Sequence, residues 1–154
     1  MKCLNPFLLL FLFLTTTTLF AQNEAITDEE LKKYAVVMDS VDNMSSELME
    51  TITELVKSND QITAARYNDL YKIIGNEEEL AEQNATPEEI EAVKAVLKKK
   101  DEGTAKIQET FKSLATEYVG AATYNKVKKA LASDADVKAR YDAILADLNK
   151  DDTE

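Results

Sequence analysis

The side chains that could do chemistry are almost all carboxylates and phenols. The sequence has no His, and its single Cys, Cys3, lies in the N-terminal apolar segment. Nucleophilic catalysis by a Ser-His or Cys-His pair is therefore not available, and neither is a thiolate–imidazole zinc site. Acidic pairs such as Glu29-Glu30 and Glu88-Glu89 could transfer protons, but each falls in the first turn of an expected helix, where acids satisfy free N–H groups. We expect no catalytic residue, no cofactor and no enzymatic activity, and a small hydrolase is the weakest alternative.

An acidic run is the candidate metal site. It comprises Glu77, Glu78, Glu79 and Glu82, whose oxygen atoms are ligands that a hard cation such as Ca²⁺ prefers. No EF-hand spacing accompanies the run, and acidic runs at helix starts are usually solvated faces. Both interpretations stay open.

Two Tyr-Asn dipeptides are the candidate partner-binding residues. They are Tyr67-Asn68 and Tyr124-Asn125, each in an expected medium-length helix. Two tyrosines with polar tips could line a pocket for a small ligand or a partner. The alternative is that each Tyr packs on the apolar residue just before its helix, as a hydrophobic staple, while Asn faces water.

The N-terminal segment, residues 1–21, predicts a secretory signal peptide. Lys2 precedes an apolar run over residues 7–14, and Ala21 supplies a small residue for cleavage. The ending Leu19-Phe20-Ala21-Gln22 resembles signal peptides of Gram-negative bacteria, which implies a periplasmic or secreted protein. No stable membrane anchor is expected after cleavage.

The expected mature chain, residues 22–154, is strongly acidic and has no cysteine. The whole sequence has 18 basic and 29 acidic side chains and a formal net charge of −11. Cleavage removes one of these charges, Lys2, so the mature chain is one unit more negative. Such a charge excludes nucleic acid and anionic lipid as partners and favours cationic partners or divalent ions. Without disulfides, stability must come from packing.

Helices are expected throughout, because Gly75, Pro87, Gly103 and Gly120 are the only Gly or Pro residues after Ala21. One long helix starts at a capping box, Thr27 with Glu30. Its apolar positions recur in steps of three and four, with a single polar member. This seam is Leu31, Tyr34, Met38, Val41, Ser45, Leu48, Ile52 and Leu55.

The same pattern returns further along the chain. Thr86 with Glu89 repeats the capping box, and Pro87 takes the favoured first helical position. The second seam is Ile90, Val93, Leu97, Lys100, Thr104, Ile107, Phe111 and Leu114, which matches the first seam position for position. Lys100 in this seam suggests that the middle of the helix is partly exposed, so an apolar strip beside it would be a docking surface.

Each long helix is followed by a medium and a shorter one. The two Tyr-Asn helices are slightly closer together in the sequence than the two capping boxes, so the second copy has the shorter connection. Asn76 and Ser133 are the expected N-caps of the short helices. Gly103 leaves open whether the second long helix breaks near residues 100–104, since Gly inside a helix costs about 1 kcal/mol relative to Ala.

With these phrases in view, the chain resembles a secreted bacterial family catalogued as domain of unknown function 4168. The matching phrases are Ile26-Thr27-Asp28-Glu29-Glu30-Leu31-Lys32-Lys33-Tyr34, and Tyr124-Asn125 followed by Lys129-Ala130-Leu131-Ala132-Ser133-Asp134-Ala135-Asp136-Val137-Lys138. The resemblance covers residues 26–148 in two tandem copies. It implies a helical fold and transfers no activity or catalytic residue.

The sequence predicts one all-α domain over residues 22–154, a bundle of about six helices. It would consist of two related units, about 26–84 and 85–149, each with a long, a medium and a short helix. The expected function is a non-enzymatic, exported binding or envelope-stress module for an unknown protein or small ligand. The alternative is a carboxylate-based binder of divalent ions or small ligands. Self-association into a homo-oligomer stays open.

Overall fold

The computed structural model describes residues 25–151, so the predicted signal peptide lies outside the described residues. This part of the chain contains helices and no strand: α1 (Asp28–Lys57), α2 (Ala64–Ile73), α3 (Glu77–Glu82), α4 (Pro87–Ser113), a π-helical segment η1 (Leu114–Tyr118), α5 (Ala121–Ser133) and α6 (Ala135–Asp151). The predicted all-α bundle of six helices is confirmed. Within residues 25–151, no helix is both long and apolar enough to cross a membrane.

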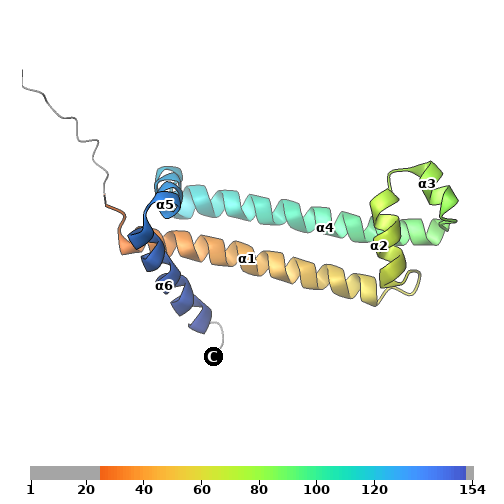
Figure 1. Cartoon of the computed structure of the whole chain (residues 1–154), viewed down its shortest axis with the longest axis horizontal. Coiled ribbons are helices and arrows are strands. Elements are labelled where there is room, and N and C mark those ends of the chain that lie inside the picture. The colour runs from red at the N-terminus through yellow and green to blue at the C-terminus, as the bar shows by residue number, and fades with distance from the viewer. Residues whose placement is uncertain (1–24, 152–154) are drawn as a thin grey trace, which may run out of the picture.

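Two long antiparallel helices, α1 and α4, form the body of the molecule (Figure 1). Both begin at the predicted capping boxes. The Glu30 N–H donates to Thr27 Oγ1 (3.1 Å), and the Thr27 N–H donates back to Glu30 Oε2 (2.8 Å). Thr86 and Glu89 make the same two bonds, at 3.2 and 3.0 Å. Each box satisfies N–H groups that a helix start leaves without intrahelical partners.

The second long helix does not break at residues 100–104. It runs through Gly103, and at this glycine α1 packs closely against α4. A Cβ atom on Gly103 would lie 2.4 Å from Leu48 Cδ1, well inside van der Waals contact. The helix-propensity cost of Gly103 is therefore offset by packing between the two long helices.

The polar seam residues Ser45 and Thr104 form hydrogen bonds within their own helices. Ser45 Oγ donates to the Val41 carbonyl (2.7 Å), and Thr104 Oγ1 donates to the Lys100 carbonyl (2.8 Å). These bonds support the interpretation in which the two positions only bend or register the helices.

Most of the buried core lies in two clusters, one at each end of the long helices. The first joins the end of α1, α2, α3 and the start of α4, through Val56, Ile62, Tyr67, Leu70, Leu80, Ala92, Val93 and Val96. The second joins the start of α1 to α5 and α6, through Leu31, Tyr34, Val127 and Val137. The prediction that Leu55 ends the first seam is wrong: Leu55 is 38% exposed and Val56 is buried in its place. A straight helix drifts from a strict heptad repeat, so the buried face has moved by one position.

The ends of the medium and short helices differ in detail from the prediction. Asn76 caps α3 as expected, with its Oδ1 accepting from the Glu78 and Glu79 N–H groups. The cap of α6 is Asp134 rather than Ser133: Asp134 Oδ1 accepts from Asp136 N (3.0 Å) and Val137 N (3.1 Å). Ser133 lies one residue too early, at the end of α5, where its hydroxyl donates to the Lys129 carbonyl.

The last helix is also not the short one. With 17 residues, α6 is longer than the 13-residue α5, whereas α3 has six residues. The prediction of long, medium and short helices therefore describes the first half but not the second.

Candidate functional site

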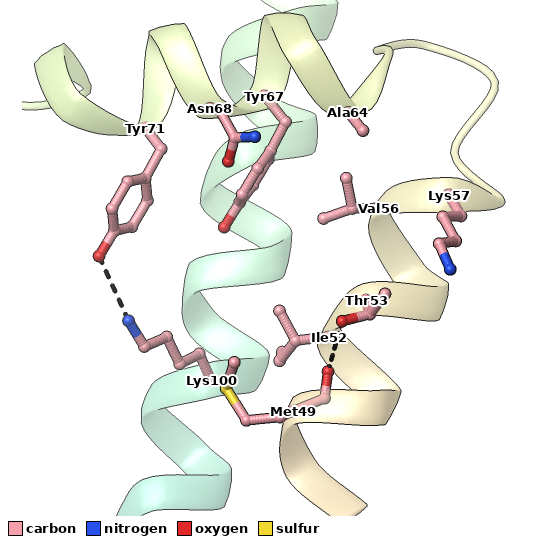
Figure 2. A pocket seen from close by; sticks show the side chains of 10 residues that line it. All are labelled: Met49, Ile52, Thr53, Val56, Lys57, Ala64, Tyr67, Asn68, Tyr71 and Lys100. Atoms are coloured by element: carbon pink, nitrogen blue, oxygen red, sulfur yellow. Dashed lines mark hydrogen bonds between the residues drawn. The ribbon is translucent and has the colours of Figure 1, made fainter. Parts of the chain in front are cut away.

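The candidate site is an open groove between the second half of α1, α2 and the middle of α4. It has a volume of about 360 Å³, within the range of roughly 300–1,000 Å³ typical of ligand sites. Figure 2 shows its lining side chains, which come from all three helices. They are Met49, Ile52, Thr53, Val56, Lys57, Ala64, Tyr67, Asn68, Tyr71 and Lys100. We refer to it as the α1–α2–α4 groove.

Two tyrosines one turn apart on α2 form one wall of the groove. Tyr67 and Tyr71 stack with ring centroids 5.9 Å apart and an interplanar angle of 25°. Tyr67 is buried, whereas Tyr71 is 38% exposed. Burial raises the pKa of the Tyr67 hydroxyl, so this phenol stays protonated at neutral pH. It can donate or accept a hydrogen bond but is not a nucleophile.

A lysine from α4 holds the outer tyrosine. Lys100 Nζ donates to Tyr71 Oη over 3.2 Å and lies 5.3 Å from the centroid of the Tyr71 ring. The hydrogen bond to the Tyr71 hydroxyl raises the pKa of Lys100, so the ammonium stays charged. Figure 2 shows the Met49 side chain extending from α1 toward Lys100 across the groove. Met49 is 62% exposed, so a flexible apolar side chain faces solvent at this point.

The charges in the groove are of one sign. Lys57 and Lys100 line it, and no carboxylate does, although the chain has a formal net charge of −11. Within the described part of the chain, neither lysine forms an ion pair with an acidic side chain. The groove therefore combines an apolar, aromatic surface with two cations.

The two predicted Tyr-Asn pairs lie at opposite ends of the molecule. Tyr67 and Asn68 line the groove, and Ile62 is buried in the same cluster as Tyr67, as the staple interpretation requires. Tyr124 instead packs among aromatic rings, 5.0 Å from Tyr34 and 5.6 Å from Phe111.

Asn125, the second asparagine, forms a hydrogen bond within its own helix. Asn125 Nδ2 donates to the Ala121 carbonyl one turn earlier, over 2.9 Å. The first Tyr-Asn pair therefore lines the groove, whereas the second is engaged in local packing and a hydrogen bond within its own helix.

The acidic run lies within α3, which Asn76 caps, and its members do not gather into an ion site. Glu77, Glu78 and Glu79 form the first turn of α3, and Glu79 Oε1 accepts from Asn76 Nδ2 over 2.6 Å. Glu79 and Glu82 line a surface hollow that they share with Lys72. Among residues 25–151, no three His, Cys, Asp or Glu side chains are grouped so that they could hold a metal ion.

Three residues that give the groove its apolar, cationic and aromatic surface were not predicted from the sequence: Met49, Lys57 and Tyr71. Tyr71 carried a signal, because it lies one helical turn after Tyr67 and so on the same helix face. Met49 and Lys57 lie outside the α1 seam, and nothing in one sequence shows that α2 turns back across them.

Comparison with protein-family models, with curated proteins and with solved structures gives no match to this chain. The resemblance to domain of unknown function 4168 therefore stays a prediction. Function has to be argued from the groove itself.

Proposed function

We propose that the protein is a non-enzymatic binding module of the bacterial envelope, periplasmic or secreted, and that its α1–α2–α4 groove holds an acidic amphipathic helix of a partner protein. One observation carries the proposal. Apolar and aromatic side chains of three helices converge with two lysines and without a carboxylate, on a chain that is otherwise strongly acidic. An envelope-stress role would be one use of such a module.

The apolar part of the groove suits a helical ligand. An amphipathic helix docks its apolar face into a groove through residues spaced three and four apart. Met49 and Tyr71 lie on opposite sides of the groove, on α1 and α2, and both are more than one-third exposed without a ligand. Burying such side chains stabilises a complex by about 25 cal/mol per Å² of apolar surface, before the costs of association.

The two lysines favour a ligand with negative charge. Lys57 and Lys100 can pair with acidic side chains that flank an apolar stripe, and they also favour the negative end of a helix dipole. The acidic remainder of the surface repels other anionic ligands, so attraction would be confined to the groove.

The two halves of the chain pack crosswise, which supports the proposed internal repeat. Arg66 of α2 binds the cap glutamate of α4, Glu89, over 2.8 Å. At the other end, Lys126 of α5 binds the cap glutamate of α1, Glu30, over 3.1 Å. Each medium helix thus holds the start of the long helix from the other half.

An alignment of the two halves explains why only one end of the molecule would bind a partner helix. When the two halves are aligned, Ile52 of the groove corresponds to Phe111, and Tyr71 corresponds to Lys128. Phe111 packs edge-on against Tyr124 at a centroid distance of 5.6 Å, so a large ring occupies the position of a smaller side chain. We infer that the repeat diverged into one packed end and one binding end.

The test is a fluorescence titration with two designed amphipathic peptides. Both carry leucines at helical spacing. The remaining positions are Glu in one peptide and Lys in the other. The Glu peptide is expected to bind, and the Lys peptide is expected to bind at least tenfold more weakly. Tyr71→Ala and Lys100→Glu should weaken binding of the Glu peptide by about tenfold each, or about 1.4 kcal/mol.

Matched controls exist on the same chain. Tyr118→Ala removes a tyrosine that is 47% exposed but does not line the groove, and Lys99→Glu reverses an exposed charge next to Lys100. Equal losses in the control variants, or equal binding of both peptides, would overturn the proposal. Binding of a small anionic amphiphile without binding of the Glu peptide would favour the small-ligand alternative instead.

A further inference from the structure

The C-terminal half of α6 projects from the body of the molecule. α6 packs on the end cluster through Val137, Tyr141 and Ile144. Toward its C-terminal end α6 diverges from α1 (Figure 1), and Leu145 and Leu148 there are only half-buried. The projecting part therefore presents two leucines at helical spacing, on one helix face, that the core cluster does not use.

The same segment is acidic. From Tyr141 to the end of α6 at Asp151, the sequence has three carboxylates and one lysine. The structure places Asp142 beside Lys138 and Asp147 beside Lys150, on the exposed side of the helix. An apolar stripe with acidic flanks is the chemistry that the α1–α2–α4 groove of the same protein accepts, with its apolar lining and its two lysines.

The segment cannot reach its own groove. α6 lies at the start of α1, whereas α2 lies near its other end (Figure 1), where residues 49–57 of α1 line the groove. Two copies placed side by side and antiparallel would bring the end of each α6 to the groove of the other. Such an arrangement is two-fold symmetric and closed, so it forms a dimer and not an open filament.

We propose that the groove of one copy holds the C-terminal half of α6 of a second copy. This inference rests on the proposed function, because it names the acidic amphipathic helix that the groove takes. Leu145 and Leu148 would pack against Met49 and Tyr71, while Lys57 and Lys100 would face the acidic flanks.

Engineered cysteines test the contact, because residues 22–154 contain no Cys of their own. The variant Met49→Cys with Leu148→Cys is oxidised mildly and run on a non-reducing gel. A disulfide needs Cα atoms within about 7 Å, and the end of α6 does not reach the groove of its own copy, so the bond must join two copies. We expect nearly complete conversion to a covalent dimer.

The controls are both single-cysteine variants and the pair Leu55→Cys with Leu148→Cys, since Leu55 is exposed on α1 but outside the groove. These should cross-link at least tenfold more slowly. Sedimentation velocity without cross-linking should show a dimer that Leu148→Asp dissociates, with the melting temperature of the monomer unchanged.

Cross-linking no faster than in the controls, together with a monomer at every concentration, would overturn the inference. The proposed function is tested separately, by titrating the Glu peptide into protein that is dilute enough to be monomeric. Absence of binding there would overturn the proposed function. Peptide binding without self-association would also overturn the inference and leave the groove as a site for a different protein.

Discussion

Two glutamates each perform two structural tasks. Glu30 and Glu89 close the capping boxes of α1 and α4, and each also binds a cation from the medium helix of the other half. The hydrogen bond from the Thr27 backbone, followed by Lys126, lowers the pKa of Glu30. For Glu89, the hydrogen bond from Arg66 is the largest cause of a lowered pKa, followed by the backbone of Thr86. Protonation of either carboxylate therefore loosens a helix start and a contact between helices at once.

These lowered pKa values predict acid sensitivity. A carboxylate whose pKa is lower in the folded state contributes stability above its unfolded pKa, here 4.5, and loses it as the pH falls through the folded value. We expect the free energy of unfolding in urea to drop as the pH falls below about 5. Glu30→Gln and Glu89→Gln should each lower stability at pH 7 and flatten this drop. An undiminished drop in the double variant would contradict the assignment.

The contact between Gly103 and Leu48 predicts a non-additive pair of substitutions. In a Leu48→Ala background, Gly103→Ala should stabilise the protein by about 1 kcal/mol, because alanine is the better helix former. In the wild type the new methyl group meets Leu48, so the gain should vanish or change sign. A double-mutant cycle in urea measures the coupling. Additive effects would mean that α1 and α4 do not approach closely at this point.

At the scale of the elements, the turn from α4 into α5 depends on one backbone conformation. Gly120 has φ = +90° and lies between Val119, which ends the π-helical segment, and the start of α5. This φ value lies where L-residues are strained, at a cost of about 1–3 kcal/mol. We expect Gly120→Ala to destabilise the protein by about that amount in thermal unfolding.

Gly75 provides the control for this prediction. A Cβ atom there meets nothing within 4 Å, and its φ is not positive. Gly75→Ala should change stability by less than about 0.5 kcal/mol. Similar losses at both glycines would indicate a general cost of adding a methyl group and contradict the role of the backbone.

Most elements follow from the sequence because their signals are local. Thr27, Thr86 and Asn76 cap helices as their types and spacing predict, since a cap is decided within one turn. The groove could not be predicted in this way. Its lining residues are far apart in the sequence, from Met49 to Lys100. Only the fold shows that α2 contacts both α1 and α4 and forms a groove with them. The Tyr-Asn dipeptide is visible because it recurs, whereas the packing of Tyr124 becomes visible only with its aromatic neighbours.

For the whole molecule, an acidic surface alone is not expected to form an ion site. Calcium at a hundredfold excess over its dissociation constant would stabilise a folded protein by about 2.7 kcal/mol. Because no three candidate ligands are grouped among the described residues, we expect calcium to leave the melting temperature of residues 22–154 unchanged. A rise of several degrees that Glu82→Gln abolishes would restore the ion-binding alternative.

The two ends of the molecule are packed differently. At one end, α5, α6 and aromatic rings pack on the start of α1, whereas the other end has an open groove with exposed Met49 and Tyr71. The long helices hold these ends apart, so a ligand in the groove should not disturb the α5–α6 end.

The methionines of the predicted mature chain make this claim measurable. After Ala21 there are three, of which Met49 lines the groove and Met38 packs against the cluster at the opposite end. With ¹³C-labelled methionine methyl groups, addition of the Glu peptide is expected to shift the Met49 signal and leave the Met38 signal in place. A shift of Met38 without one of Met49, or no shift of either at saturating peptide, would contradict the account.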